Sequence, residues 1–261
     1  MTSEPWHANR VAVVTGGNAG IGLAIAKALA VRGARVAVGA RRTGDAAVAA
    51  QTEDEIGNGA VAAALDVCHT ASVADFIADV RDRLGTPDIL VNSAGVSVHQ
   101  TVCGHSDEDW DAVIDANLSG PFRMIRACLP SMIQSGWGRI INVASTAATT
   151  AMPTHAAYCA SKSGLLGLTR AVAQEGAPHG VTALAVSPTW VETDMLRASA
   201  AKQAAAAGHD YATEMAALAS ANPQNRLVQA EEIAALVSFI CSDQAPGLTM
   251  EDIQLNAGAQ W

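Results

Sequence analysis

Short apolar runs alternate with longer amphipathic segments along this chain. The runs at 11–14, 35–39, 60–65, 89–91, 139–143, 181–186 and 252–256 have the length and composition of strands buried in a parallel sheet. Helical patterns lie between them, notably 23–31, 107–134 and 231–242, and the second of these has Ser106 as its N-cap and Pro121 as a kink. This alternation predicts an α/β fold with a doubly wound parallel sheet of about seven strands.

Length and composition place these elements in a single domain, residues 1–261. Half of the 261 residues are hydrophobic, which suffices for one large core. The formal charge of −9 argues against a nucleic-acid partner, whose footprint is a basic patch. The sequence has neither a signal-peptide pattern nor an apolar run of about 18 residues, so we expect a cytoplasmic protein without a membrane partner. Its five cysteines are scattered and form no CxxC pair, which predicts reduced thiols and no metal site.

A glycine-rich turn follows the first apolar run. Gly16 permits a tight turn, Gly20 lets the backbone approach a pyrophosphate, and Gly22 allows close packing of the next helix. The start of that helix offers free N–H groups and positive dipole character. We therefore predict a dinucleotide site and count Asn18 and Ile21 of the same turn among its contacts. A glycine turn without a ligand is the alternative.

The spacing GxxxGxG, in place of the commoner GxGxxG, resembles the short-chain dehydrogenase/reductase family in its single-domain branch. The resemblance covers roughly residues 9–258 and includes an NxxG element and a YxxxK pair. Its general pattern is similar to that of the 3-oxoacyl and polyketide ketoreductases. The resemblance implies a Rossmann-like fold, a nicotinamide dinucleotide, a small carbonyl or alcohol substrate, and a homotetramer.

The second apolar run ends in Ala40, Arg41 and Arg42. An NAD site usually has an acidic residue at this strand tip, where it binds the ribose 2′-hydroxyl, and Ala40 occupies that position. A guanidinium instead suits a 2′-phosphate, through charge-assisted bidentate hydrogen bonds. We therefore predict NADP(H), with Arg41 as the main determinant and Arg42 in support. If the arginines only begin a solvated turn, NAD(H) is the alternative.

The resemblance implies further cofactor contacts after the later strands. Asp66 would bond the adenine amino group with help from the Val67 backbone, although Asp66 could equally cap the helix that begins near Ser72. Ser93 replaces the second Asn of the family's usual NNAG, so the hydrogen bond of that amide is made differently or lost. The contacts carried over from the family are Asp66, Val67, Asn92, Ala94, Gly95, Pro188, Val191 and Thr193.

Tyr158 and Lys162 lie four residues apart, and on a helix they project from the same face. A phenol titrates at about 10, so it is a poor acid–base catalyst at neutral pH unless a fixed ammonium lowers its pKa. Ser145 precedes Tyr158 by 13 residues, as it does in the family. With Asn117 of the NxxG element, these residues match the family's catalytic tetrad.

The tetrad implies hydride transfer between the nicotinamide and a carbonyl or secondary alcohol carbon. In reduction, Tyr158 would donate a proton to the carbonyl oxygen and Ser145 would hydrogen-bond the same oxygen. Lys162 would lower the pKa of Tyr158 and hold the nicotinamide ribose, and Asn117 would hold a water that links Lys162 to solvent. Two alternatives are an NAD(H)-dependent dehydrogenase of a hydroxylated metabolite or steroid, and a non-catalytic dinucleotide-binding regulator.

Residues 189–226 are expected to form a substrate lid, with a second helix from about Asp210. Thr193 would hold the nicotinamide carboxamide together with the Val191 backbone, or it would cap the helix that follows. Candidates for an apolar pocket, which could equally be ordinary packing residues, are Met195, Leu196, Tyr211 and Met215.

Loops near the expected pocket contain Cys103, His155 and Trp190. His155 could be a second proton donor or a structural or solvent-facing residue, because it precedes Tyr158 by three positions. Leaving the terminal Trp261 in water is costly, so we expect it to pack against a neighbouring subunit.

Overall fold

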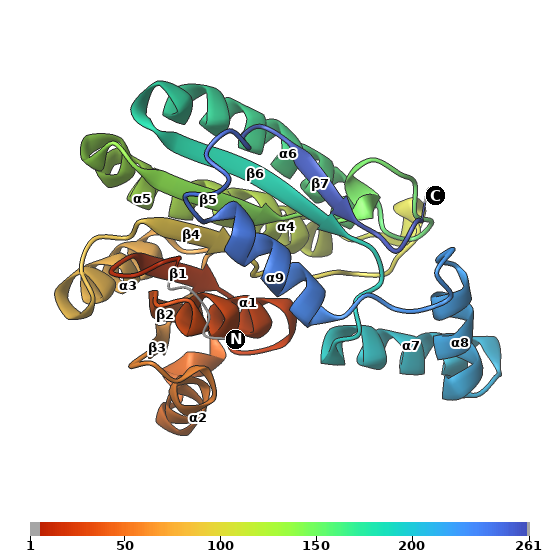
Figure 1. The fold of residues 1–261 in the computed structure, drawn as a ribbon. Helices are drawn as coiled ribbons and strands as arrows, with labels where there is room; N and C mark the ends of the chain where they lie inside the picture. Colours follow the sequence, from red (N-terminus) through yellow and green to blue (C-terminus); the bar gives the residue numbers. More distant parts are fainter. Residues whose placement is uncertain (1–5, 260–261) are drawn as a thin grey trace.

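The computed structural model describes residues 6–259. Its sheet has seven strands in the order β3-β2-β1-β4-β5-β6-β7, and every pair is parallel (Figure 1). This topology confirms the predicted doubly wound, single-domain α/β fold. The strands are β1 (Val11–Thr15), β2 (Arg35–Ala40), β3 (Val61–Ala64), β4 (Ile89–Asn92), β5 (Gly138–Val143), β6 (Val181–Pro188) and β7 (Asp252–Leu255).

Helices cover both faces of the sheet. The core beneath α1 and α9 is separate from the core beneath α3, α5 and α6. Every helix in the described part of the chain is too short or too polar to cross a membrane. The helices are α1 (Gly20–Val31), α2 (Ala46–Ile56), α3 (Thr70–Arg83), α4 (Asp107–Ile114), α5 (Gly120–Ser135), α6 (Ala156–Gly176), α7 (Asp194–Ala207), α8 (Tyr211–Ser220) and α9 (Ala230–Ile240).

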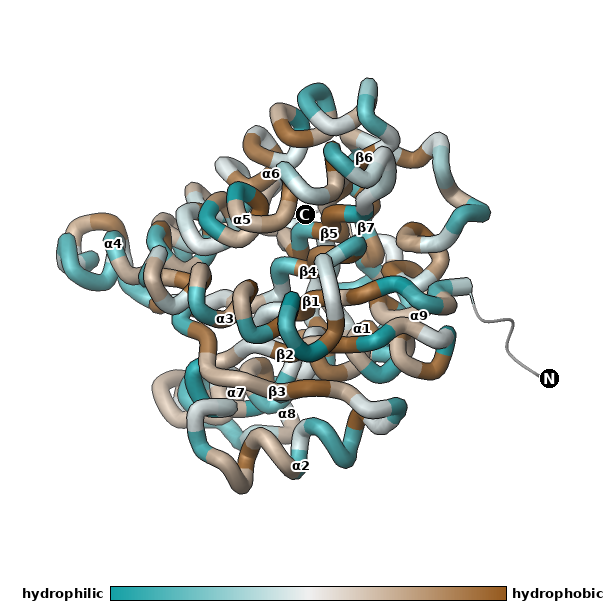
Figure 2. The backbone as a smooth tube through the Cα atoms, turned by 90° about the vertical axis from the view of Figure 1, so that its left-hand side faces the viewer, coloured by the Kyte–Doolittle hydropathy of each residue, from teal (hydrophilic) through white to brown (hydrophobic). Residues whose placement is uncertain are grey.

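The central strands are apolar on both faces because helices bury both. In β1, Ala12 and Val14 belong to the core beneath α1 and α9, whereas Val11 and Val13 belong to the opposite core. Successive side chains of a strand point to opposite faces, so an uninterrupted apolar run serves two cores. Figure 2 shows the result as hydrophobic strands in the middle of a more polar shell.

The segment predicted as one helix over 107–134 is divided. A π-helical turn, Asp115–Ser119, separates α4 from α5. Ser106 caps α4 as predicted, since its hydroxyl accepts a hydrogen bond from the Asp109 N–H at 3.0 Å. Pro121 does not kink a helix interior: it is the second residue of α5, directly after the π turn, where a missing N–H costs least.

Two other boundaries differ slightly from the sequence prediction. The helix expected to begin near Ser72 is α3, which begins at Thr70. The second helix expected in the segment 189–226 is α8, and Asp210 is its N-cap. In Figure 1, α7 and α8 project away from the sheet beyond the end of β6, and α8 has no buried residue. The expected packing of Trp261 lies outside the described residues.

Candidate active site

A cleft of about 700 Å³ lies at the carboxyl ends of the strands. Its walls come from the segments that follow β1, β2, β3, β4, β5 and β6, as expected for a doubly wound sheet. The residues predicted from the sequence that line it are Gly16, Asn18, Gly20, Ile21, Gly22, Arg41, Arg42, Asp66, Val67, Ala94, Gly95, Ser145, Tyr158, Lys162, Pro188, Val191 and Thr193.

The glycine turn after β1 leaves backbone N–H groups facing the cleft. Gly16 and Gly20 have φ values of +66° and +52°, which side chains disfavour. A Cβ on Gly22 would lie 2.5 Å from the carbonyl oxygen of Gly16, so no side chain fits there. Ala19 is the N-cap of α1 and supplies no side-chain acceptor. The start of α1 is therefore open to an anion such as a pyrophosphate.

The loop after β4 is held by a threonine of β1. The Thr15 hydroxyl accepts hydrogen bonds from the N–H groups of Ser93 and Ala94, each at 3.1 Å. Asn92 does not reach the cleft, because its side chain is buried and donates to the Asn142 side-chain oxygen at 2.8 Å. Its role is to join β4 to β5 beneath the site.

Arg41 and Arg42 stand exposed at the rim of the cleft, after β2. The buried Thr43 hydroxyl fixes their turn by donating to the Ala40 carbonyl at 2.8 Å and accepting from the Ala40 N–H at 3.1 Å. Within residues 6–259, neither arginine forms an ion pair with an acidic side chain. Both guanidinium groups are therefore available to an anionic ligand.

Asp66 closes a turn instead of capping α3. Its side chain accepts a hydrogen bond from the Cys68 N–H at 3.0 Å, and the N-cap of α3 is His69. Asp66 and Val67 both line the cleft. The helix-cap alternative for Asp66 is therefore wrong, and its contact with an adenine amino group stays a prediction.

Tyr158 and Lys162 come from the first two turns of α6, and Ser145 follows β5. Burial raises the pKa of Tyr158, while its hydrogen bond with Ser145 acts in the opposite direction. Lys162 is not among the causes of that shift. Its ammonium lies 5.6 Å from the ring centroid of Tyr158 and donates to the Val143 carbonyl at 2.7 Å.

Desolvation of the phenol is the largest cause of its raised pKa, and the expected lowering of that pKa by Lys162 stays a prediction. Burial also lowers the pKa of Lys162 to about 8. A phenol with a raised pKa stays protonated at neutral pH. Tyr158 therefore keeps its proton at neutral pH, with Ser145 beside it.

Asn117 lies in the π turn and is fully buried behind the cleft. Its side chain accepts from the Val96 N–H at 2.8 Å and donates to the Val96 carbonyl at 2.9 Å. It also donates to the Ser161 hydroxyl at 3.1 Å. Asn117 therefore ties the loop after β4 to α6, one residue before Lys162, and π turns of this kind often occur at functional sites.

The segment after β6 completes the cleft. Thr193 caps α7, since its hydroxyl accepts from the Leu196 N–H at 3.3 Å, and its methyl group would lie 3.3 Å from a Cβ added on Gly20 of the glycine turn. Val191 forms an isolated bridge with Val228. Thr193 therefore has the capping role that the sequence left as an alternative, and its expected contact with a carboxamide stays a prediction.

A second cavity, of about 630 Å³, lies between the loop before α6 and helices α7 and α8. His99, Met152, His155 and Trp190 line both this cavity and the main cleft. Of the expected pocket residues, Met195 and Leu196 line the main cleft, whereas Tyr211 and Met215 line neither cavity.

Sequence reasoning missed His99 and Met152 as residues of the site. His99 is 56 residues from His155, its partner in the structure, and neither belongs to a recognisable spacing. Their position in loops at the carboxyl ends of β4 and β5 is the one signal that could have found them. His155 is buried, which excludes the solvent-facing alternative.

Comparisons with known proteins agree with this geometry. Residues 10–204 match the family model described as short chain dehydrogenase. A Streptomyces virginiae protein named as a ketoacyl reductase of the monensin polyketide synthase is 42% identical over 96% of this chain and 97% of its own length. The 3-oxoacyl-[acyl-carrier-protein] reductase FabG of Escherichia coli K12 is 36% identical over 95% of this chain and 96% of its own.

A solved structure shows the same fold. A variant of the actinorhodin polyketide ketoreductase, crystallised with NADPH, superposes with a TM-score of 0.90 and 33% sequence identity. The match covers 95% of this chain and 96% of the other.

Proposed function

This chain belongs to the short-chain dehydrogenase family of oxidoreductases, and we propose that it reduces ketones, or oxidises the corresponding secondary alcohols, with NADP(H). The observation that carries the proposal is the meeting of two features in one cleft. Tyr158, Ser145 and Lys162 converge there, and the open start of α1 lines the same space. Proton-donor chemistry and a site for a dinucleotide pyrophosphate are thereby adjacent.

The residues of the cleft fit a nicotinamide dinucleotide. The N–H groups at the start of α1 would hold the pyrophosphate, and Gly20, with a φ of +52°, has no side chain to block its approach. Arg41 and Arg42 would bind a ribose 2′-phosphate, which supports NADP(H) over NAD(H). The similar ketoreductase structure that contains NADPH favours the same choice.

When bound, the cofactor supplies or accepts the hydride. In reduction, Tyr158 donates its phenolic proton to the carbonyl oxygen, and because burial makes the phenol a weaker acid, the nearby Lys162 charge is needed to stabilise the phenolate that remains. The Ser145 hydroxyl donates a hydrogen bond to the same oxygen and stabilises the charge that develops on it. Lys162, fixed on the Val143 carbonyl, keeps a positive charge beside the reacting groups below pH 8.

The names of the similar proteins point to 3-oxoacyl and polyketide substrates. We propose a carbonyl compound of that class, with its apolar part in the cavity beneath the lid, residues 189–226. The formation of a substrate lid by residues 189–226 and assembly as a homotetramer stay predictions. The mass of the native protein in solution would test the second.

Initial rates with 3-oxoacyl thioesters and simple ketones, each with NADPH and NADH, test the proposal. We expect turnover and a preference for NADPH. Arg41→Ala should lower kcat/KM for NADPH by about tenfold to a hundredfold, because a charge-assisted hydrogen bond contributes about 1.5–3 kcal/mol, and should leave the NADH rate unchanged. Arg83→Ala on α3 is the control. Tight NADPH binding without turnover of any ketone or alcohol would favour a non-catalytic regulator.

A further inference from the structure

One arginine joins two separate segments of the cleft wall. Arg123 lies in the first turn of α5, directly after the π turn. Its Nη1 donates to the Val67 carbonyl at 3.1 Å, and its Nη2 donates to the Asp115 carboxylate at 2.7 Å. Val67 follows β3, whereas Asp115 is the first residue of the π turn, and both line the main cleft. Arg123 therefore holds this part of the wall from behind.

The two segments meet at Cys68, which also lines the cleft. Burial, followed by the carboxylates of Asp66 and Asp115, raises the pKa of the Cys68 thiol to about 11. A carboxylate has such an effect only at short range, so both carboxylates lie close to the same thiol. Asp115 thus belongs to the same part of the cleft as Asp66, the residue for which an adenine contact is predicted.

The same two segments are also in tight apolar contact. Gly120 ends the π turn, and its N–H donates to the Asp115 carbonyl. A Cβ on Gly120 would lie 2.8 Å from the Cγ2 atom of Val67, so a side chain at this position would push the segments apart. The Val67 side chain therefore packs against the end of the π turn, and Arg123 adds a polar tie to the Val67 backbone.

An arginine suits this bridge better than a lysine. The guanidinium is planar, keeps its charge, and carries donors that diverge from one rigid fork. It can therefore bind a carbonyl on one segment and a carboxylate on another while it fixes the angle between them. The Arg123 side chain is 19% exposed and that of Asp115 is 36% exposed, so water only partly screens the pair.

We propose that Arg123 is a positioning residue for the adenosine half of the cofactor. By holding Val67 and Asp115 in a fixed relation, it sets the space beside Asp66 in which an adenine would lie. The proposal rests on the proposed function, because it requires a dinucleotide in the cleft. Arg123 acts through Val67 and Asp115, whereas Arg41 would contact the 2′-phosphate directly.

The expected effect of Arg123→Met differs from that of Arg41→Ala. Methionine keeps an apolar stem but removes both hydrogen bonds. Because NADPH and NADH have the same adenine, we expect KM for both to rise by the same factor, about tenfold. The kcat at saturating cofactor should stay within about twofold of the parent value, since Tyr158 and Ser145 are unchanged. Arg41→Ala should alter the use of NADPH alone.

Direct binding tests the inference without any activity assay. Calorimetric titration of the full chain with 2′,5′-ADP, which contains the adenosine and the 2′-phosphate but no nicotinamide, should give about tenfold weaker binding in Arg123→Met. Arg123→Lys should lie between that variant and the parent chain, because one ammonium replaces a fork of donors. The matched control is Arg126→Met: Arg126 is exposed on the same helix, 5.2 Å from the Phe122 ring, and this variant should bind as the parent does.

Parent affinity for 2′,5′-ADP in Arg123→Met would overturn the inference. A fall in kcat as large as the rise in KM would also overturn it, because Arg123 would then act on the reacting end of the cleft. If Arg123→Met melts below the parent temperature, Arg123→Lys decides in its place, and parent affinity in that variant would overturn the inference. A parent chain that does not bind 2′,5′-ADP would instead overturn the proposed NADP(H) site, and the role of Arg123 with it.

Discussion

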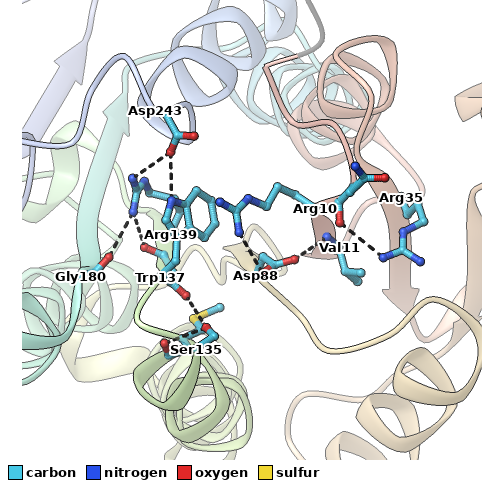
Figure 3. Close-up of polar contacts among 12 residues, drawn as sticks. Arg10, Val11, Arg35, Asp88, Ser135, Trp137, Arg139, Gly180 and Asp243 are labelled. Atoms are coloured by element: carbon cyan, nitrogen blue, oxygen red, sulfur yellow. Dashed lines mark hydrogen bonds and ion pairs between the residues drawn. The ribbon is translucent and has the colours of Figure 1, made fainter.

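The two ends of the parallel sheet use charged and aromatic residues in opposite ways. At the amino ends of the strands, the Trp137 ring lies between two guanidinium groups (Figure 3). The Cζ atom of Arg10 is 3.6 Å from the ring centroid, and that of Arg139 is 4.2 Å from it. Asp88 accepts from the Val11 N–H at 2.9 Å, and Asp243 accepts from the Trp137 indole at 2.9 Å. These polar groups are paired with one another across β1, β4, β5 and α9.

At the carboxyl ends, comparable groups are aimed into the cleft. The start of α1 has no side-chain cap, Arg41 and Arg42 have no acidic partner within residues 6–259, and Tyr158 is desolvated beside Ser145. Polar groups that are satisfied within the protein stabilise the fold, whereas groups left for a ligand carry function. We therefore expect substitutions at the carboxyl ends to change activity and those at the amino ends to change stability.

Tyr158→Phe should give the largest effect, because it removes the proton donor and little else. A positioned acid contributes about 10²–10⁴ in rate, so we expect kcat/KM to fall by that factor. The free energy of unfolding should change by about 1 kcal/mol or less, since one hydrogen bond with Ser145 is lost. Steady-state rates and urea unfolding measure both, and NADPH titration should show unchanged affinity. A strongly destabilised Tyr158→Phe variant would contradict the expectation that residues at the carboxyl ends of the strands affect activity and not stability.

Trp137→Ala should have the reverse profile. Loss of the indole removes two cation–π contacts and the hydrogen bond to Asp243, so the free energy of unfolding should fall by about 2–4 kcal/mol. The activity of the folded protein should not change. Trp137→Phe keeps an aromatic face and should lose only about 1 kcal/mol. A reduced kcat in a folded Trp137 variant would show that the two ends are coupled.

Gly22→Ala tests whether the glycine turn serves the ligand or only the fold. The new methyl group would meet the Gly16 carbonyl at 2.5 Å, and overpacking of this kind costs about 1–3 kcal/mol. We expect NADPH affinity to fall by about tenfold to a hundredfold. Gly167→Ala on α6 is the matched control, because no atom lies within 4 Å of its added methyl group. Equal NADPH affinity in both variants would show that the glycine turn does not contribute to NADPH binding.

The smallest expected effect is the dependence of the reductive rate on pH. Burial lowers the pKa of Lys162 to about 8 and raises that of Tyr158, so Lys162 loses its proton first as pH rises. Reductive kcat/KM should therefore fall through pH 8 by up to about tenfold, while Tyr158 stays protonated. Lys162→Arg, which keeps its charge, should move the fall to higher pH. A reductive kcat/KM that does not change up to pH 10 would show that the Lys162 charge does not affect the reaction.

Sequence reasoning predicted the strands, the order of the site residues and most of the cleft. The apolar runs and the glycine turn are local signals, and β1 and Gly16 could be assigned without knowing what packs against them. The π turn at 115–119 could not be found in this way. Within this turn, the Asn117 side chain forms hydrogen bonds with Val96 and Ser161. Both residues lie far from Asn117 in the sequence, so a local pattern does not reveal them.

The pKa of Tyr158 shows the same limit. A four-residue spacing to Lys162 indicates that the two side chains share a helix face, but it does not report how much water reaches the phenol. Desolvation depends on every segment that covers the ring, and here it is the largest cause of the raised pKa.

Local pattern by itself determined the α/β fold, the position of the glycine turn and the pairing of Tyr158 with Lys162, because each depends on neighbours within a few residues. Only the tertiary structure decided which distant residues meet. It brought His99 to His155 and Trp137 between Arg10 and Arg139. The physical reason is that burial and electrostatic environment depend on the whole packed chain, whereas hydrophobic period and turn chemistry depend on adjacent residues.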